Sequence, residues 1–311
     1  MTVLVRDLRA TDPADVEAVV RVRRAALPYM ITNPEVIGFE LSSAHPAKRY
    51  RLLVAEDGRG EVVGTAQVGV VHDSAEPGRA FVNAYVHPGR RGLGAGTAIL
   101  RAAEEHLAAE GATEVFSWVL DEPVHRGFAE RRGYRPSRSA HFLRLDLAAA
   151  ALPPLPELPA GVELRPASDF AGDPRPLFLA DAETTADEPG DVDVEFDDFE
   201  DWVRHTWNNP VLDKELTVVA LVEGEVAAFT AAQTDGATRY ASAMTGTLRA
   251  HRGRGLAKLA KAASLHRARA AGYTEAFTEN DSGNEPMLAI NDWFGYEVCA
   301  TETRFTKKLG A

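Results

Sequence analysis

The chain has 311 residues, of which 45% are hydrophobic and 26% charged, and its formal net charge is −12. This length suits two globular domains of about 150 residues each, and the acidic balance argues against a nucleic-acid-binding protein, whose affinity rests on phosphate neutralisation. The single cysteine, Cys299, excludes an intrachain disulfide and fits a reducing compartment. No apolar run of about 18 residues is present, and residues 1–7 lack the core of a signal peptide. We therefore expect a cytoplasmic protein without nucleic-acid or membrane partners; the sequence leaves monomer or homodimer open.

The first half alternates strand-like and helix-like segments. Asp12-Pro13 favours a helix start, because proline suits the first turn, and Asp57-Gly58 is typical of a hairpin turn. The expected strands are 3–9, 51–56, 61–71, 79–87, 114–119 and 134–145, and the expected helices are 12–27, 34–43, 94–109 and 124–132. Residues 148–160 contain four prolines and predict a stiff linker.

The second half repeats this order of elements. The expected strands are 162–165, 216–222, 225–233, 240–248, 274–278 and 296–307, and the expected helices are 170–186, 196–207, 255–271 and 285–293. The sequence thus predicts two α/β (α+β type) domains, 1–147 and 161–311, each with a mixed, mostly antiparallel sheet flanked by helices.

Two glycine-rich turns mark the repeat. Each stands between a strand and a helix, the first at Arg91-Gly92-Leu93-Gly94-Ala95-Gly96 and the second at Arg252-Gly253-Arg254-Gly255-Leu256-Ala257. Arg252 follows Arg91 by 161 positions, and Gly295-Tyr296 follows Gly133-Tyr134 by 162. Two such turns in the same order of elements indicate a duplicated domain.

Both turns predict an anion site. The first N–H groups of a helix have no partner within the helix, and the helix dipole places partial positive charge there. Gly253 and Gly255 can adopt positive φ and let a ligand approach the backbone, while Arg252 and Arg254 add charge.

The pattern Arg-x-x-Gly-x-Gly/Ala between a strand and a helix resembles the signature of the GNAT acetyltransferase superfamily. Together with Thr278-Glu279-Asn280, residues 284–291 and Phe294-Gly295-Tyr296, it is similar to actinobacterial-type tandem GNAT proteins, of which mycothiol synthase is a distant relative. The resemblance implies acetyl-CoA as co-substrate, with its pyrophosphate on the loop amides and no metal. The implied cofactor-binding residues are Val86, Arg91, Gly92, Gly94, Gly96, Thr247, Leu248, Arg252, Gly253, Arg254, Gly255, Leu256, Ala257 and Asn284.

The resemblance also implies that a backbone N–H near Val86, or near Thr247 and Leu248, stabilises the oxyanion; an ordinary strand end is the alternative. Asn284 is expected to bond the pantetheine arm or simply to cap a helix. The matching residue of the first half is Glu122, a carboxylate that cannot donate a hydrogen bond. We therefore expect a catalytic C-terminal domain and an N-terminal domain that binds CoA only or is structural.

Catalytic residues are harder to assign. The family's usual acid is a tyrosine four residues before the glycine of the Gly-aromatic pair, where this chain has Ala129 and Asn291. Thiolate can leave without an acid, since a thiol pKa is about 8.5. Asn291 is a candidate by position, and Glu279 and Asp281 are candidates for the base or ordinary loop carboxylates.

An acidic stretch follows in the second half, with eleven carboxylates among residues 181–201. Asp187, Glu188 and Asp191 are candidates for binding a cationic acceptor, or they belong to a solvated surface. The sequence predicts an N-acetyltransferase that moves acetyl from acetyl-CoA to a small, cationic primary amine. The alternative is a non-catalytic acetyl-CoA-binding sensor or scaffold.

Overall fold

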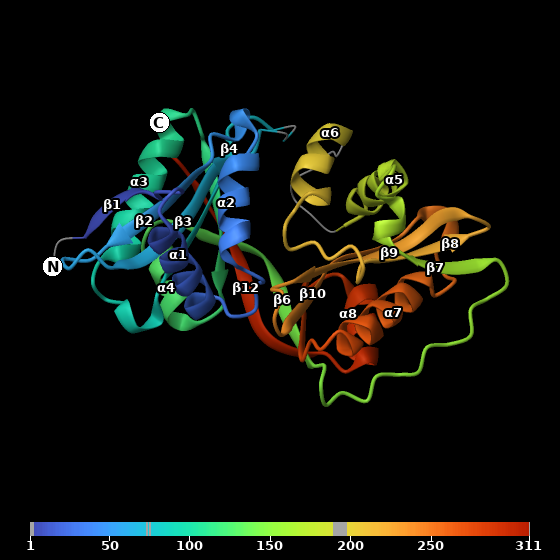
Figure 1. Ribbon diagram of the computed structural model, residues 1–311. Helices are drawn as coiled ribbons and strands as arrows, with labels where there is room; N and C mark the ends of the chain where they lie inside the picture. The colour runs from blue at the N-terminus through green and yellow to red at the C-terminus, as the bar shows by residue number, and fades with distance from the viewer. Residues whose placement is uncertain (1–2, 73, 75, 189–197, 311) are drawn as a thin grey trace. The chain divides into compact units, whose positions relative to one another are not determined.

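The computed structural model describes residues 3–72, 74, 76–188 and 198–310 (Figure 1). The chain forms two compact units: the first comprises Met1–Ser139 with Ala300–Ala311, and the second comprises Ala140–Cys299. Within the described ranges, no helix is long and apolar enough to cross a membrane.

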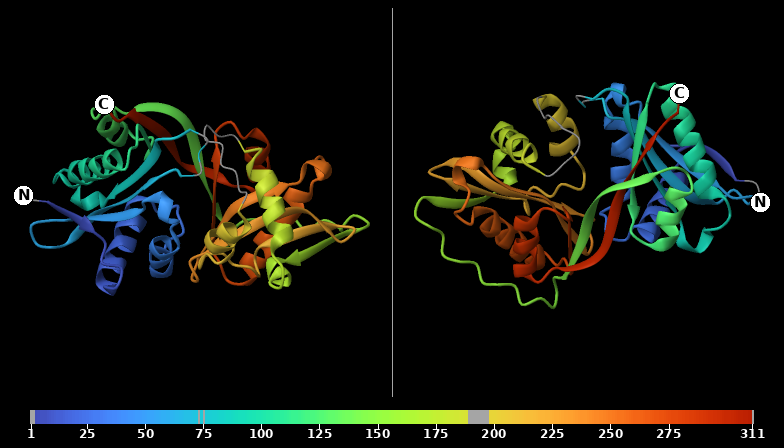
Figure 2. Two further views of the ribbon diagram at one scale, coloured as in Figure 1. Left: turned by 90° about the horizontal axis from the view of Figure 1, so that it is seen from above. Right: turned by 180° about the vertical axis from the view of Figure 1, so that it is seen from behind.

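The first unit is a mixed sheet with helices on both faces. Its strands lie in the order β1-β2-β3-β4-β5-β12, and among its described residues only β4 and β5 pair in parallel. Helices α1 and α2 cover one face and α3 the other (Figure 2). The bounds are β1 Leu4–Asp7, α1 Pro13–Ala26, α2 Pro34–Ser43, β2 Arg51–Glu56, β3 Val62–Val70, β4 Arg79–Val86, α3 Ala95–Ala109, β5 Glu114–Leu120, α4 Pro123–Glu130 and β12 Glu297–Lys308. Leu107 and Ile99 of α3 are fully buried in the core that forms against the sheet.

The second unit repeats this plan. Its strand order is β6-β11-β10-β9-β8-β7, and only β10 and β11 are parallel. Helices α5 and α6 lie on one face, and α7 and α8 on the other (Figure 1). The bounds are β6 Arg135–Asp146, β7 Val162–Pro166, α5 Arg175–Thr185, α6 Phe199–Trp202, β8 Val218–Val222, β9 Glu225–Thr234, β10 Arg239–Thr247, α7 Leu256–Ala270, β11 Glu275–Asp281 and α8 Glu285–Phe294.

Two segments depart from the expected helices. The helix expected over 170–186 begins only at Arg175, as α5, after a 3-10 turn at Ala167–Phe170; Pro174 is its N-cap, and Asp173 accepts a hydrogen bond from the Arg175 N–H. Of the helix expected over 196–207, residues 196 and 197 lie outside the described residues, and the rest is α6 followed by a π-helical turn at Val203–Trp207. Residues 148–160 contain no helix or strand, and they lie within the second compact unit.

The closing strand of each unit comes from the other half of the sequence. Residues 140–146 of β6 pair with β11, from Ala140 opposite Asp281 to Asp146 opposite Glu275. Residues 302–308 of β12 pair with β5, from Glu302 opposite Leu120. The expected boundaries at 147 and 161 follow the sequence repeat, whereas the compact units divide within β6 and β12. An apolar strand pattern does not specify its partner, so this exchange is invisible in the sequence.

In each unit, the pairing between the two parallel strands ends before the carboxyl ends of those strands. β4 and β5 pair only through Phe81 and Phe116, after which the Asn83 side chain accepts a hydrogen bond from the Trp118 N–H at 3.1 Å. β10 and β11 pair only through Ser242 and Thr278, and the register of β10 on β9 shifts just beyond that point. Both pairs therefore end before the glycine loops begin.

The strand exchange predicts that Phe305→Ala unfolds the first unit. Phe305 is 1% exposed and packs in the first core, although it lies near the C-terminus. Truncating a buried phenylalanine costs about 3–5 kcal/mol. In hydrogen exchange, the amides of β2 to β5 should lose protection while those of β8 to β11 keep it. The matched variant Phe294→Ala, in the second core, should show the reverse pattern. Equal loss in both units for both variants would contradict this assignment.

Candidate functional site

Both glycine loops have the backbone that an anion site requires. Gly94 and Gly255 cap α3 and α7 in the left-handed region, with φ of +90° and +73°, and no side chain caps either helix. Gly92 and Gly253 also have positive φ, at +81° and +75°. A Cβ added at any of the four glycines would meet no atom within 4 Å. The loop amides therefore border open space, at the positive ends of two helices.

A cavity of about 440 Å³ opens at the first loop. It runs from the loop to Ala26 and Leu27 at the end of α1 and is lined by the carboxyl ends of β4 and β5 and by α4. Its lining includes Tyr85, Val86, Arg91, Gly92, Gly94, Gly96, Leu100, Ser117, Trp118, Val119, Leu120, His125, Phe128, Ala129, Arg131, Arg132, Tyr134 and Glu302. This cavity occupies the region where β4 and β5 no longer pair.

The charges around this cavity are of both signs. Arg91, Arg131 and Arg132 contribute cationic groups from the loop and the end of α4. Glu302 contributes a carboxylate, is 6% exposed and lies opposite Leu120 at the carboxyl end of β5. Burial, and then the charge of Arg91, lower the pKa of His125, so its imidazole is neutral at pH 7.

Strand pairing narrows the set of oxyanion donors. The Leu248 N–H donates to the Ala227 carbonyl at 2.9 Å, and the His87 N–H donates to Val63 at 2.9 Å. Successive N–H groups of a strand point to opposite sides, so Thr247 and Val86 direct theirs away from β9 and β3, toward β11 and β5. Leu248 therefore uses its N–H in the sheet, and Val86 and Thr247 remain as candidates.

Asp187 contacts the arginines beside the second loop. Its carboxylate accepts hydrogen bonds from Arg249 at 2.6 and 2.9 Å and from Arg252. These bonds, those of Arg249 first, lower the pKa of Asp187 to about 2. One turn earlier, Glu183 accepts a hydrogen bond from the Arg249 N–H at 2.7 Å. The Asp187 charge is thus paired with the loop. Glu188 follows Asp187 at the surface, and the third predicted acceptor residue, Asp191, lies outside the described residues.

The remaining predicted residues lie along β11 and α8. Asn284 caps α8 by accepting a hydrogen bond from the Met287 N–H at 3.3 Å, so the capping alternative is the contact that forms. Asp281 accepts one from the Gly283 N–H at 2.8 Å, and Glu279 is an exposed residue of β11. A role for Glu279 or Asp281 as a base stays a prediction.

Asn291 belongs to a buried polar chain. Lys261 of α7 is 0% exposed and donates from Nζ to Asn291 Oδ1 at 2.5 Å. Asn291 Nδ2 in turn donates to Asn280 Oδ1 at 2.6 Å, and the Lys261 ammonium lies 5.1 Å from the centre of the Tyr296 ring. Burial lowers the pKa of Lys261 to about 7. Asn291 therefore forms an internal network with Lys261 and Asn280.

The same positions of the first unit line its cavity. With the offsets of 161 and 162, Lys261 corresponds to Leu100, Asn291 to Ala129 and Tyr296 to Tyr134. Leu100, Ala129 and Tyr134 all border the 440 Å³ cavity. The two units thus have the same order of elements. They differ in the side chains between α3 and α4 of the first unit and between α7 and α8 of the second.

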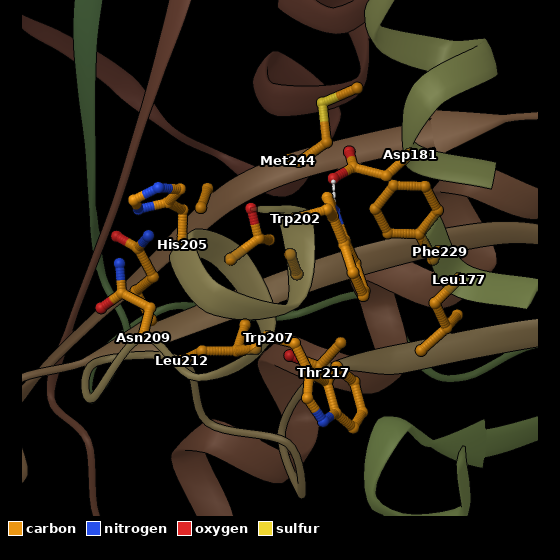
Figure 3. A pocket seen from close by; sticks show the side chains of 14 residues that line it. Leu177, Asp181, Trp202, His205, Trp207, Asn209, Leu212, Thr217, Phe229 and Met244 are labelled. Atoms are coloured by element: carbon orange, nitrogen blue, oxygen red, sulfur yellow. Dashed lines mark hydrogen bonds between the residues drawn. The ribbon is translucent and has the colours of Figure 1, made fainter. Parts of the chain in front are cut away.

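A smaller pocket of about 190 Å³ lies in the second unit, among β9, β10, α5 and the turn after α6 (Figure 3). Asp181 and Trp202 meet there, with the indole Nε1 donating to the carboxylate at 2.7 Å (Figure 3). Burial raises the pKa of Asp181. His205 and Asn209 also line the pocket. Asp181 belongs to the acidic stretch, but it is not one of the three acceptor residues that the sequence predicted.

The sequence profile of the acetyltransferase (GNAT) family matches two regions of the chain, residues 21–134 and 178–296. The chain belongs to the GNAT acetyltransferase family. The two matches confirm the predicted superfamily and its tandem arrangement, and they fit the mixed sheet with flanking helices in each unit.

Relatives of this chain include proteins named mycothiol acetyltransferase. The protein of Nocardia farcinica is 36% identical over 143 residues, which is 46% of this chain and 44% of that protein. The protein of a Nocardioides species is 26% identical over 237 residues, which is 72% of this chain and 79% of that protein. The chain therefore matches less than half of the length of the first of these relatives.

Solved structures share the fold over the whole length. A tandem GNAT protein from the clavulanic acid biosynthesis pathway aligns with a TM-score of 0.73 at 22% identity, covering 100% of this chain and 99% of that one. A GCN5-related N-acetyltransferase from Sphaerobacter thermophilus aligns with a TM-score of 0.71 at 21% identity, covering 99% and 96%. At these identities the likeness concerns the fold alone.

Sequence reasoning did not find Lys261, Asp181 or His205. A signal for Lys261 was present, since the offset of 161 places this lysine opposite Leu100 on the buried face of an amphipathic helix. No comparable signal singles out Asp181 among eleven carboxylates, because its burial depends on packing against Trp202.

The burial of Lys261 predicts a pH-dependent stability. Its pKa is about 7 in the folded protein, against about 10.4 in an unfolded chain. Between these values the unfolded state holds more protons, so the unfolding free energy should rise with pH, by at most ~1.4 kcal/mol per unit from this group. Lys261→Met removes that contribution. In urea titrations the stability of wild type relative to Lys261→Met should increase from about pH 7 to about pH 10. A constant difference would show that the ammonium is not buried.

Proposed function

We propose that the protein is an N-acetyltransferase that transfers the acetyl group of acetyl-CoA to a primary amine. The observation that supports it best is the first unit's cavity, which joins a positive-φ glycine loop to the end of α1 through the region where β4 and β5 no longer pair. Family membership and the names of the two relatives support an acetyl donor such as acetyl-CoA.

The residues of the first unit fit a CoA thioester. Amides at the start of α3, with Arg91, suit the pyrophosphate, because they present aligned donors at a positive helix end. Trp118 and Phe128 give the cavity apolar walls that suit a pantetheine arm. The N–H of Val86 points toward β5, where a thioester oxygen would need a donor as it gains charge.

Transfer requires an unprotonated amine. Deprotonating an alkylamine with a pKa of about 10.4 costs about 4 kcal/mol of free energy at pH 7.4. The nitrogen attacks the thioester carbon, the tetrahedral intermediate expels the CoA thiolate, and the nitrogen loses its second proton. A thiolate with a pKa of about 8.5 leaves without obligatory protonation, so the absence of a tyrosine at Ala129 is compatible with turnover.

A carboxylate that could hold a cationic acceptor lies in each unit. In the first unit, Glu302 places a carboxylate on the wall of the cavity. In the second, Asp181 lines the 190 Å³ pocket on the face where the acidic stretch begins. Glu302 lines the same cavity as the first glycine loop. We therefore prefer the first unit as the place of acetyl transfer. Catalysis in the C-terminal half stays a prediction, and its supporting observation is the Asp181 pocket.

Gly94→Glu and Gly255→Glu form a matched pair for locating acetyl-CoA. Each places a carboxylate at a positive-φ position where phosphate should approach, and a Cβ at either position meets no atom within 4 Å. Charge-assisted hydrogen bonds contribute about 1.5–3 kcal/mol each, so loss of two weakens binding more than tenfold. Calorimetry with acetyl-CoA should show this loss for Gly94→Glu and near wild-type affinity for Gly255→Glu. The reverse result would move the donor to the second unit.

The acceptor is located by a second pair, Glu302→Gln and Asp181→Asn, which remove charge and keep shape. A cationic amine bound at the first cavity should show a KM at least tenfold higher in Glu302→Gln, at unchanged kcat, because a uniform binding contact is lost. Asp181→Asn should leave both constants near wild type. The opposite pattern would favour the second-unit pocket.

The rival function is a sensor or scaffold that binds acetyl-CoA without turnover. Steady-state release of CoA in the presence of a panel of small amines separates the two. Amine-dependent release that stops in Gly94→Glu supports the enzyme. Tight binding without release for any amine in the panel favours the sensor.

A further inference from the structure

The second unit has a glycine loop of the right conformation, but the space beside it differs from that of the first unit. In the first unit, Leu100, Ala129 and Val119 line the cavity between α3, α4 and β5. In the second unit, the corresponding residues are Lys261, Asn291 and Asn280, which are hydrogen-bonded to one another at 2.5 and 2.6 Å. Three positions that line the cavity in the first unit are thus occupied in the second unit by polar side chains that are hydrogen-bonded in series.

We propose that Lys261 closes the second unit to the pantetheine arm, so that the protein binds a single acetyl-CoA, in its first unit. This inference rests on the proposed function, since it assumes that the first cavity takes acetyl-CoA. It assigns a role in cofactor selectivity to a residue that touches neither the loop nor the proposed acceptor residues.

The contact is difficult to open. Lys261 and Asn291 are both 0% exposed, so separating them would leave a buried amide and a buried amine without their partners. Lysine is also longer than leucine, and its Nζ reaches across from α7 to α8. An arm lying between these helices would have to displace both side chains.

A second contact joins the same two helices. Lys258 Nζ lies 3.8 Å from the centre of the Trp293 ring. The corresponding residues of the first unit are Thr97 and Arg131, which line the cavity. α7 and α8 are therefore joined at two positions whose counterparts border the cavity of the first unit. This agreement between independent contacts is what favours closure over an isolated buried lysine.

The loop itself adds a third difference. Arg252, which corresponds to Arg91, is bonded to Asp187, whereas Arg91 lines the open cavity. A pyrophosphate arriving at the second loop would compete with this carboxylate for the guanidinium. The second unit is thus closed at the position of the arm and neutralised at the position of the phosphates.

Calorimetry with acetyl-CoA in the Gly94→Glu background tests the inference, because this change impairs binding at the first loop. Gly94→Glu alone should weaken acetyl-CoA binding more than tenfold. Adding Lys261→Leu, which installs the residue of the first unit, should recover part of that loss at one acetyl-CoA per chain, because the contact of Arg252 with Asp187 remains. Leu259→Ala is the control: it also truncates a buried α7 side chain, but one that packs toward β8 and β9. This control should not restore binding.

The reciprocal change uses the first unit. Leu100→Lys in an otherwise wild-type chain should weaken acetyl-CoA binding more than tenfold, and this holds as a test if Lys261→Leu fails to fold. Wild-type affinity in Leu100→Lys, or two bound acetyl-CoA molecules per wild-type chain, would overturn the inference and leave the proposed function intact. No binding to the wild-type chain would instead overturn the proposed function.

Discussion

The early end of the parallel pairing between β4 and β5 is the constraint on which the candidate site depends. The pairing of β4 with β5 stops after Phe81 and Phe116, so the N–H of Val86, which points away from β3, faces the cavity instead of a paired strand. That space begins at the glycine loop, which caps α3 with unshared amides. The end of strand pairing and the glycine cap of α3 thus border the same cavity, which is the one we propose for acetyl-CoA.

On the proposed closure of the second unit, a few side chains separate an open site from a closed one. β10 and β11 also part early, and the second loop keeps its left-handed glycines. What differs is side-chain chemistry: Leu100 and Ala129 leave room, whereas Lys261 and Asn291 bond across it. The buried lysine has a cost in stability, because its desolvated ammonium is held by few partners.

Local patterns predicted most elements and both loops, because hydrophobic period, proline and glycine act over short distances. The exchange of β6 and β12 was not predictable in this way, since strand partners are chosen by long-range packing. For the same reason the sequence suggested Asp187 as an acceptor residue, although it pairs with Arg249 and Arg252. Asn284 caps α8, which is one of the two alternatives that the sequence left open. The partner of Asn291 is Lys261, which lies thirty positions earlier on another helix.

The most direct test of the account is a crystal structure of the protein with acetyl-CoA. The account predicts one molecule, with its pyrophosphate on the amides that begin α3, its arm beside Leu100 and Ala129, and its thioester near Val86. In that structure Lys261 should still bond to Asn291. Acetyl-CoA bound only at the second loop, with Lys261 displaced from Asn291, would contradict the account.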